Sequence, residues 1–106
     1  MSEPFSKINS RAEFFVAVRR ALAALTALVG AEPGYPLWAS MKRQLEAILT
    51  WTAEGREPTD DECERISVGQ QVVRELEPID DEALYELGQD LHEIQYFFQE
   101  HYSTTR

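Results

Sequence analysis

Apolar residues recur at three- and four-residue intervals along most of this 106-residue chain, which is the period of an α-helix with one buried face. The pattern predicts four helices, over about 10–29, 37–53, 59–76 and 80–102. Short turns join them, and short connections favour antiparallel neighbours. The sequence therefore predicts an all-α, up-and-down bundle of about four helices, a single domain over 1–106 in which residues 1–9 form a loosely packed tail.

Polar residues mark where the predicted helices begin. Asn9 or Ser10 is expected to cap the first helix, and Pro36 suits the first turn of the second because proline lacks the N–H that would have no partner there. The run Thr59-Asp60-Asp61-Glu62 matches a capping box, in which hydroxyl and carboxylate each accept from the other's backbone N–H. Asp80 is expected to cap the fourth helix.

Two glycines fall inside predicted helices, where each costs about 1 kcal/mol relative to alanine. Gly69 lies in the third helix and Gly88 in the fourth. Close approach of two helices at a crossing explains such glycines, and a partner's backbone lying against the helix is the alternative. We expect the first explanation to hold for Gly69. Gly30, in contrast, is expected to end the first helix.

Cys63 is the only cysteine, which excludes an internal disulfide and suits a reducing bacterial cytoplasm. It falls on the predicted buried stripe of the third helix, and the acidic residues Asp61, Glu62 and Glu64 beside it oppose thiolate formation. We therefore expect a core thiol and not a nucleophile. The full stripe consists of Cys63, Ile66, Gln70, Val73 and Leu76.

The charge is unevenly distributed. Nineteen acidic and ten basic side chains leave a net charge of −9, and residues 54–106 carry fifteen of the acidic groups but only four of the basic ones. Such a chain repels phosphate and lacks the basic stripe of nucleic-acid-binding proteins, so neither nucleic acid nor an anionic membrane is an expected partner. The apolar run after Arg20 resembles a signal peptide, but the helical stripe begins upstream at Phe14, and the run falls short of the ~20 residues of a membrane span.

Known patterns of catalytic and metal sites do not occur in the sequence. Di-iron bundles use Glu-x-x-His pairs, whereas Gln89 and Phe98 stand three residues before His92 and His101. The chain also lacks a phosphate-binding glycine loop, a nucleophile elbow and zinc-ligand spacing. We expect no cofactor, no metal and no enzymatic activity, and a function in binding another protein.

Aromatic residues of the fourth helix suggest where that protein binds. Tyr85, Tyr96, Phe97 and Tyr102 lie largely off the leucine stripe, beside carboxylates. Tyrosines in such a setting are typical of protein-binding patches. The alternative is that they cover the bundle's ends or a second core face, and the sequence leaves both interpretations open.

A set of short motifs at fixed spacing connects the chain to a known family. These are Pro33-Gly34-Tyr35, Arg43-Gln44-Leu45 with Ile48, Ile66, Val68-Gly69, and Val73-Arg74-Glu75-Leu76 running to Asp80. In order and spacing, residues 28–96 resemble small all-helical immunity proteins of type VI secretion systems, which protect bacteria from NAD(P)-glycohydrolase effector toxins. The tail of residues 1–9 has no counterpart in the resemblance.

The resemblance implies that the partner is a cognate effector toxin domain and that this chain inhibits it by docking over its substrate cleft. A cleft that binds anionic NAD(P) tends to be electropositive, so an acidic plug complements it. An antitoxin or adaptor for a different protein, or a homodimeric structural module, remains the alternative, although a homo-oligomer is not predicted. The candidate partner-binding residues are Tyr35, Trp38, Asp60, Asp61, Glu64, Tyr85 and Tyr96.

Overall fold

The computed structural model describes residues 8–76 and 79–104, and it confirms the predicted all-α bundle, with no strand in those two segments. Three long helices build most of the molecule. Two short helices and two single turns connect them, and a third turn follows the last long helix. The long helices are α1 (Arg11–Ala31), α2 (Pro36–Trp51) and α5 (Glu82–Glu100). The others are η1 (Ala53–Gly55), α3 (Asp60–Glu64), α4 (Val68–Gln71), η2 (Val72–Leu76) and η3 (Tyr102–Thr104).

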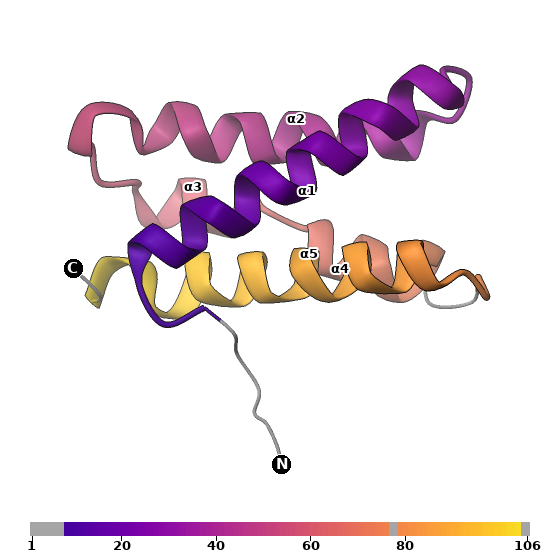
Figure 1. Cartoon of the computed structure of the whole chain (residues 1–106). Helices are drawn as coiled ribbons and strands as arrows, with labels where there is room; N and C mark the ends of the chain where they lie inside the picture. The colour runs from indigo at the N-terminus through magenta and orange to yellow at the C-terminus, as the bar shows by residue number, and fades with distance from the viewer. Residues whose placement is uncertain (1–7, 77–78, 105–106) are drawn as a thin grey trace, which may run out of the picture.

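The helices form two layers (Figure 1). α1 and α2 make an antiparallel hairpin, and α1 crosses obliquely over α5, so that it packs on both. α3 and α4 pack against α5 in the second layer. The molecule is correspondingly flat, with extents of 36 × 35 × 20 Å.

Most of the predicted helix starts are confirmed. Ser10 caps α1 by accepting from the N–H of Glu13, and Pro36 is the first residue of α2. Both halves of the capping box between Thr59 and Glu62 are present at the start of α3. These signals are local, and for that reason the sequence is sufficient to predict them.

Two predicted helix ends are wrong by one or two residues. The cap of α5 is Asp81, whose carboxylate accepts from the N–H of Leu84, and not Asp80. Gly30 does not end α1, which continues to Ala31.

Aromatic side chains in the core pack the start of α1 against the end of α5. The Phe14 ring of α1 stacks on Phe97 and Phe98 of α5, with centroids 5.3 and 5.8 Å apart, and Tyr102 packs edge-on against it. The guanidinium of Arg11 lies 3.8 Å from the centre of the Tyr102 ring. Phe97 and Tyr102 are therefore core residues. For these two, the interpretation that the aromatic residues of the fourth helix cover the bundle's ends or a second core face is confirmed.

The prediction of one continuous third helix is wrong. It breaks between α3 and α4, and after α4 it widens into the π-helical turn η2. Because the break changes the rotation of the chain, Val68 and Val72 enter the core while Gln70 and Val73 of the predicted stripe are exposed. Of that stripe, only Ile66 and Leu76 are buried, and Cys63 is half-buried.

Three glutamines from other helices satisfy the backbone groups that the break releases. The side-chain amide of Gln99 donates to the carbonyls of Cys63 (2.9 Å) and Ile66 (3.1 Å). Gln44 Oε1 accepts from the N–H of Ser67 at 2.7 Å, and Gln95 Oε1 accepts from the N–H of Gly69, in the first turn of α4, at 2.6 Å. The break is thus a built feature that α2 and α5 hold in place.

Helix contact explains both glycines inside the bundle, as predicted for Gly69. A Cβ at Gly69 would lie 2.9 Å from Gln95 Oε1, and one at Gly88 would lie 3.0 Å from Val72 Cγ1. At Gly88 the missing side chain lets η2 approach α5, and at Gly69 it leaves room for the end of the Gln95 side chain, which accepts from the Gly69 N–H.

By length and composition, α1 is the one described helix that could cross a membrane. The expectation that its apolar run is too short for a span is therefore wrong as an argument from length. Phe14, Val18 and Leu25 of α1 are fully buried in the bundle. A core helix and an N-terminal signal sequence both meet the same criteria.

Candidate partner-binding surface

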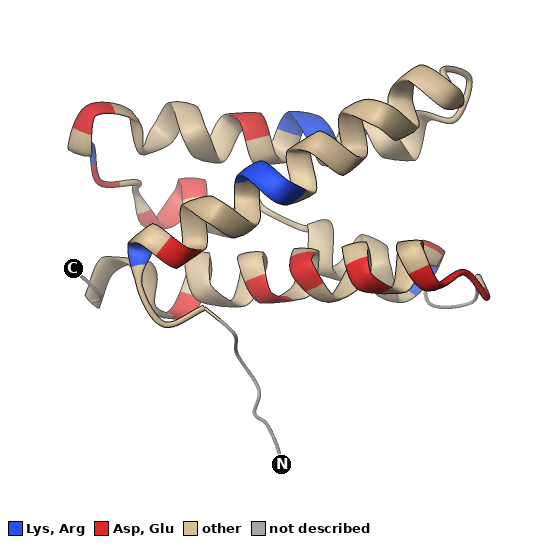
Figure 2. Cartoon of the chain, in the orientation of Figure 1, with Lys and Arg blue, Asp and Glu red and all other residues tan. Residues whose placement is uncertain are grey.

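An acidic stripe runs along the outside of α5 (Figure 2). At 100° per residue, its five carboxylates fall within an arc of roughly 80° around the helix. Their spacing of three, four or seven residues is the sequence signal that identifies the stripe. The residues are Glu82, Glu86, Asp90, Glu93 and Glu100.

One of these carboxylates is neutralised within the bundle. Arg20 of α1 makes two hydrogen bonds to Asp90, at 2.8 and 2.9 Å, and this pairing raises the pKa of the Arg20 guanidinium. No ion pair among residues 8–76 and 79–104 involves Glu82, Glu86 or Glu100. The stripe therefore presents a negative field to an approaching molecule.

Two tyrosines lie beside the stripe, on the side of α5 that faces α4 and η2. Tyr85 is 64% exposed and Tyr96 is 51% exposed, so both are available to a partner as the sequence indicated. We name the boundary between α5 and the α4–η2 segment the α5–η2 seam. It is lined by Gln70, Val73, Ile79, Tyr85, Gln89 and Tyr96.

Two shallow hollows follow one another along the seam. The larger, of about 280 Å³, lies between Val73 and Tyr96. The smaller, of about 30 Å³, lies between Ile79 and Tyr85. The sequence pattern does not predict Val73 at the surface, because it indicates an unbroken third helix. The exposure of Val73 follows from the break, for which the neighbouring residues carry no local signal.

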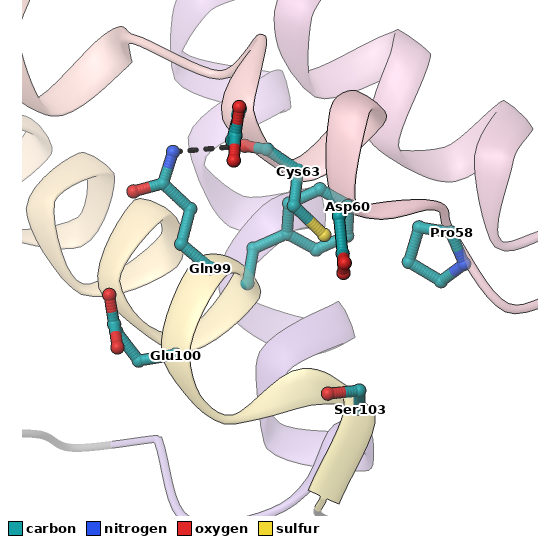
Figure 3. A pocket seen from close by; sticks show the side chains of 8 residues that line it. Pro58, Asp60, Cys63, Gln99, Glu100 and Ser103 are labelled. Carbon is teal, nitrogen blue, oxygen red and sulfur yellow. Dashed lines mark hydrogen bonds between the residues drawn. The ribbon is translucent and has the colours of Figure 1, made fainter.

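A separate hollow of about 280 Å³ lies where α3 meets the end of α5 (Figure 3). It brings the predicted residues Asp60 and Glu64 together with Glu100 of the acidic stripe and with Ser103. Cys63 also lines it, and burial, followed by the charges of Asp60, Glu62 and Glu64, raises the pKa of its thiol. The hollow can accept a basic side chain but is poorly suited to thiolate chemistry.

The remaining predicted residues lie apart from these. Asp61 pairs with Arg65 at 2.8 Å on the outside of α3. Tyr35 is 37% exposed at the α1–α2 turn, at the opposite end of α2 from α3, and stacks edge-on against Trp38. Trp38 is 2% exposed and donates through Nε1 to Glu32, so it belongs to the core and offers little surface to a partner. The seven candidates therefore form no single site. Tyr85 and Tyr96 share the seam, Asp60 and Glu64 share the hollow at the end of α5, and the other three lie elsewhere.

None of the described residues form a group of three or more His, Cys, Asp or Glu side chains that could hold a metal ion. The surface features are those of a binding protein: exposed aromatics and charge, with shallow hollows between helices.

Comparison with known protein families identifies the family of this chain. The model of the Tsi6 family, whose members are type VI secretion immunity proteins, matches residues 15–100. The chain belongs to the Tsi6 family. The match extends from α1 through α5, so this Tsi6-family protein carries its acidic stripe and its seam inside the matched region. No curated protein and no solved structure gave a match. Membership implies that this Tsi6-family protein binds a cognate toxin protein.

Proposed function

We propose that this chain is a bacterial cytoplasmic immunity protein that binds a cognate type VI effector toxin with NAD(P)+-glycohydrolase activity and blocks its substrate cleft. The observation that carries the proposal is the family match over residues 15–100. The resemblance of residues 28–96 to proteins that neutralise NAD(P)-degrading toxins supports the choice of toxin.

The charge distribution fits occlusion of such a cleft. A site that binds NAD+ or NADP+ must hold the phosphates of a dinucleotide, so its walls tend to be electropositive. The acidic stripe of α5 and the carboxylates Asp60 and Glu64 near its end give one side of this molecule the opposite potential. Complementary charge speeds encounter, and buried aromatic or aliphatic anchors slow release.

The proposal is tested in cells that express the toxin domain encoded beside this chain's gene. NAD+ and NADP+ are measured with and without the chain, and the two proteins are co-purified through a tag on the toxin. Preserved dinucleotide together with co-purification is the expected result. A toxin variant that binds the chain but lacks catalytic activity is the control for indirect effects on the dinucleotide pool.

Two other outcomes would each remove part of the proposal. Co-purification with no fall of NAD+ or NADP+ in the unprotected cells would mean an immunity protein against a different toxin chemistry. Loss of dinucleotide despite the chain, with no co-purification, would leave an antitoxin or adaptor for some other protein.

A further inference from the structure

Exposed apolar side chains are concentrated on one part of the described surface. Six large apolar side chains are exposed among residues 8–76 and 79–104, and four of them line the α5–η2 seam. The other two are isolated: Val16 is on α1 and Tyr35 is at the α1–α2 turn. The four on the seam are Val73, Ile79, Tyr85 and Tyr96.

Close packing and hydrogen bonds join the two sides of the seam. Gly88 lets η2 approach α5 closely, and Gln95 joins the two sides by bonding the N–H of Gly69 at 2.6 Å and the side chain of Gln70 at 3.0 Å. The apolar side chains therefore stand on a fixed base. A preorganised surface loses little freedom on binding, which favours affinity.

The acidic stripe borders this apolar strip along α5. At 100° per residue, Tyr96 and Tyr85 lie roughly 40° and 60° from Glu82 around the helix, on the side away from Asp90. An apolar centre beside a charged rim is the arrangement in which aromatic anchors contribute most of the binding energy.

We propose that the toxin docks on the α5–η2 seam, with Tyr96 and Val73 as its central anchors and Tyr85 as a flanking one. The inference rests on the proposed function and names the surface that performs it. The occupant is a toxin surface with an apolar contact region and basic residues beside it, because the acidic stripe at the border of the seam requires a complementary charge. The α1–α2 turn around Tyr35, which the sequence also indicated, lies outside this interface.

The experiment measures the affinity of the purified chain for the toxin domain encoded beside its gene. Tyr96→Ala and Val73→Ser are each expected to raise Kd by at least about tenfold, as truncation of a central anchor does. Tyr35→Ala removes a tyrosine of lower exposure elsewhere, and Val16→Ser removes an equally exposed valine from α1; both are expected to leave Kd within about threefold. All four positions are exposed, and circular dichroism of each variant checks that it is folded.

Side-chain footprinting of the wild-type chain tests the same surface without substitutions. In the complex, Tyr85 and Tyr96 should lose reactivity toward hydroxyl radicals, and Tyr35 should keep it. Protection of Tyr35 alone, or seam variants that bind as tightly as wild type, would overturn the docking surface while leaving the immunity function in place. Failure of the wild-type chain to bind the toxin would overturn the proposed function and this inference with it.

A second copy of the chain is the other molecule that such a strip could bind. Sedimentation of the free wild-type chain as a dimer that Tyr96→Ala converts to a monomer would show that the seam joins two copies, and would overturn the toxin as its occupant. A monomer at all concentrations, with the binding losses above, supports the proposal.

Discussion

The backbone N–H of Gly69 donates a 2.6 Å hydrogen bond to Oε1 of Gln95, so a side chain of α5 fills the space that a Cβ at position 69 would need. This contact joins the short helix after the break to the longest helix of its layer. It accounts for a glycine where the helix alone would favour alanine.

Alanine at the two packed glycines should therefore destabilise the fold. Gly69→Ala would displace Gln95 from the Gly69 N–H, and Gly88→Ala would press on the stiff side chain of Val72. We expect each to lower the free energy of unfolding by about 1–2 kcal/mol, after the gain in helix propensity is included. Urea denaturation followed by circular dichroism measures both.

Gly30→Ala is the matched control. Gly30 lies inside α1, and a Cβ there would meet nothing within 4 Å. Helix propensity should then act alone and raise the free energy of unfolding by up to about 1 kcal/mol. Equal changes at all three glycines would show that packing across the seam is not what selects glycine there.

The glutamine contacts at the helix break give a second prediction. Gln99→Ala removes the donor to the carbonyls of Cys63 and Ile66, and we expect a loss of about 1–2 kcal/mol in the free energy of unfolding. Hydrogen exchange of the amides near residues 63–69 should accelerate at the same time. Gln89→Ala is the control on the same helix: its side chain makes no hydrogen bond to another described residue, so stability should change by only a few tenths of a kcal/mol. A similar loss for both variants would contradict the role given to Gln99.

These contacts also mark what the sequence could and could not predict. α1, α2 and α5 follow from apolar period and local caps, so their bounds are nearly right. The break in the third helix depends on Gln44, Gln95 and Gln99, which are distant in sequence, and no pattern near residues 65–67 reports them.

The exposure of the candidate site residues could likewise be predicted only in part. Tyr85 and Tyr96 are exposed because they lie off the buried stripe of α5, which helical geometry predicts. Phe97, about 60° off that stripe, is buried because α1 brings Phe14 against the end of α5, and Tyr102 of η3 packs on the same ring. Trp38 is buried beside the α1–α2 turn, where its Nε1 donates to Glu32 and Tyr35 packs edge-on against it. A single helix shows which residues can face outward, but the crossing of α1 decides which of them do.

The capping box at Thr59 should make the free energy of unfolding depend on pH below about pH 5. The hydrogen bond from Arg56, followed by that from the N–H of Thr59, lowers the pKa of Glu62 below its ordinary value of 4.5. A carboxylate with a lowered pKa in the folded state stabilises the fold above its unfolded pKa, and this contribution disappears as the pH falls through the folded value. Glu62→Gln should therefore flatten the loss of stability below about pH 5 in urea denaturation at a series of pH values.

Arg56→Gln separates the two causes. It leaves the Thr59 hydrogen bond but removes the larger one, so its pH profile should lie between those of wild type and Glu62→Gln. Identical slopes for wild type and Glu62→Gln would mean that this carboxylate does not contribute to the acid sensitivity of the fold.

Cys63 should react slowly for a thiol at neutral pH. Burial, followed by the charges of Asp60, Glu62 and Glu64, raises the pKa of the thiol, which leaves less of the reactive thiolate. We expect alkylation by iodoacetamide at about pH 7.5 to be at least several-fold slower than for free cysteine. Unfolding in urea should restore the free-cysteine rate and serves as the control. A folded-state rate above that of free cysteine would return Cys63 to consideration as a reactive group.

If the acidic stripe steers toxin encounter, salt should act on association and not on release. Raising the ionic strength from about 0.05 to 0.5 M shortens the screening length from roughly 14 to 4 Å, so the on-rate should fall at least several-fold while the off-rate hardly changes. Replacing Glu82 and Glu86 by glutamine should lower the on-rate at low salt and weaken its salt dependence. Replacing Glu46 and Glu54, outside α5, makes the same change in net charge and should do less. An on-rate indifferent to salt would show that charge does not guide the toxin at all. Equal effects of the two pairs would show that net charge, and not the stripe, guides it.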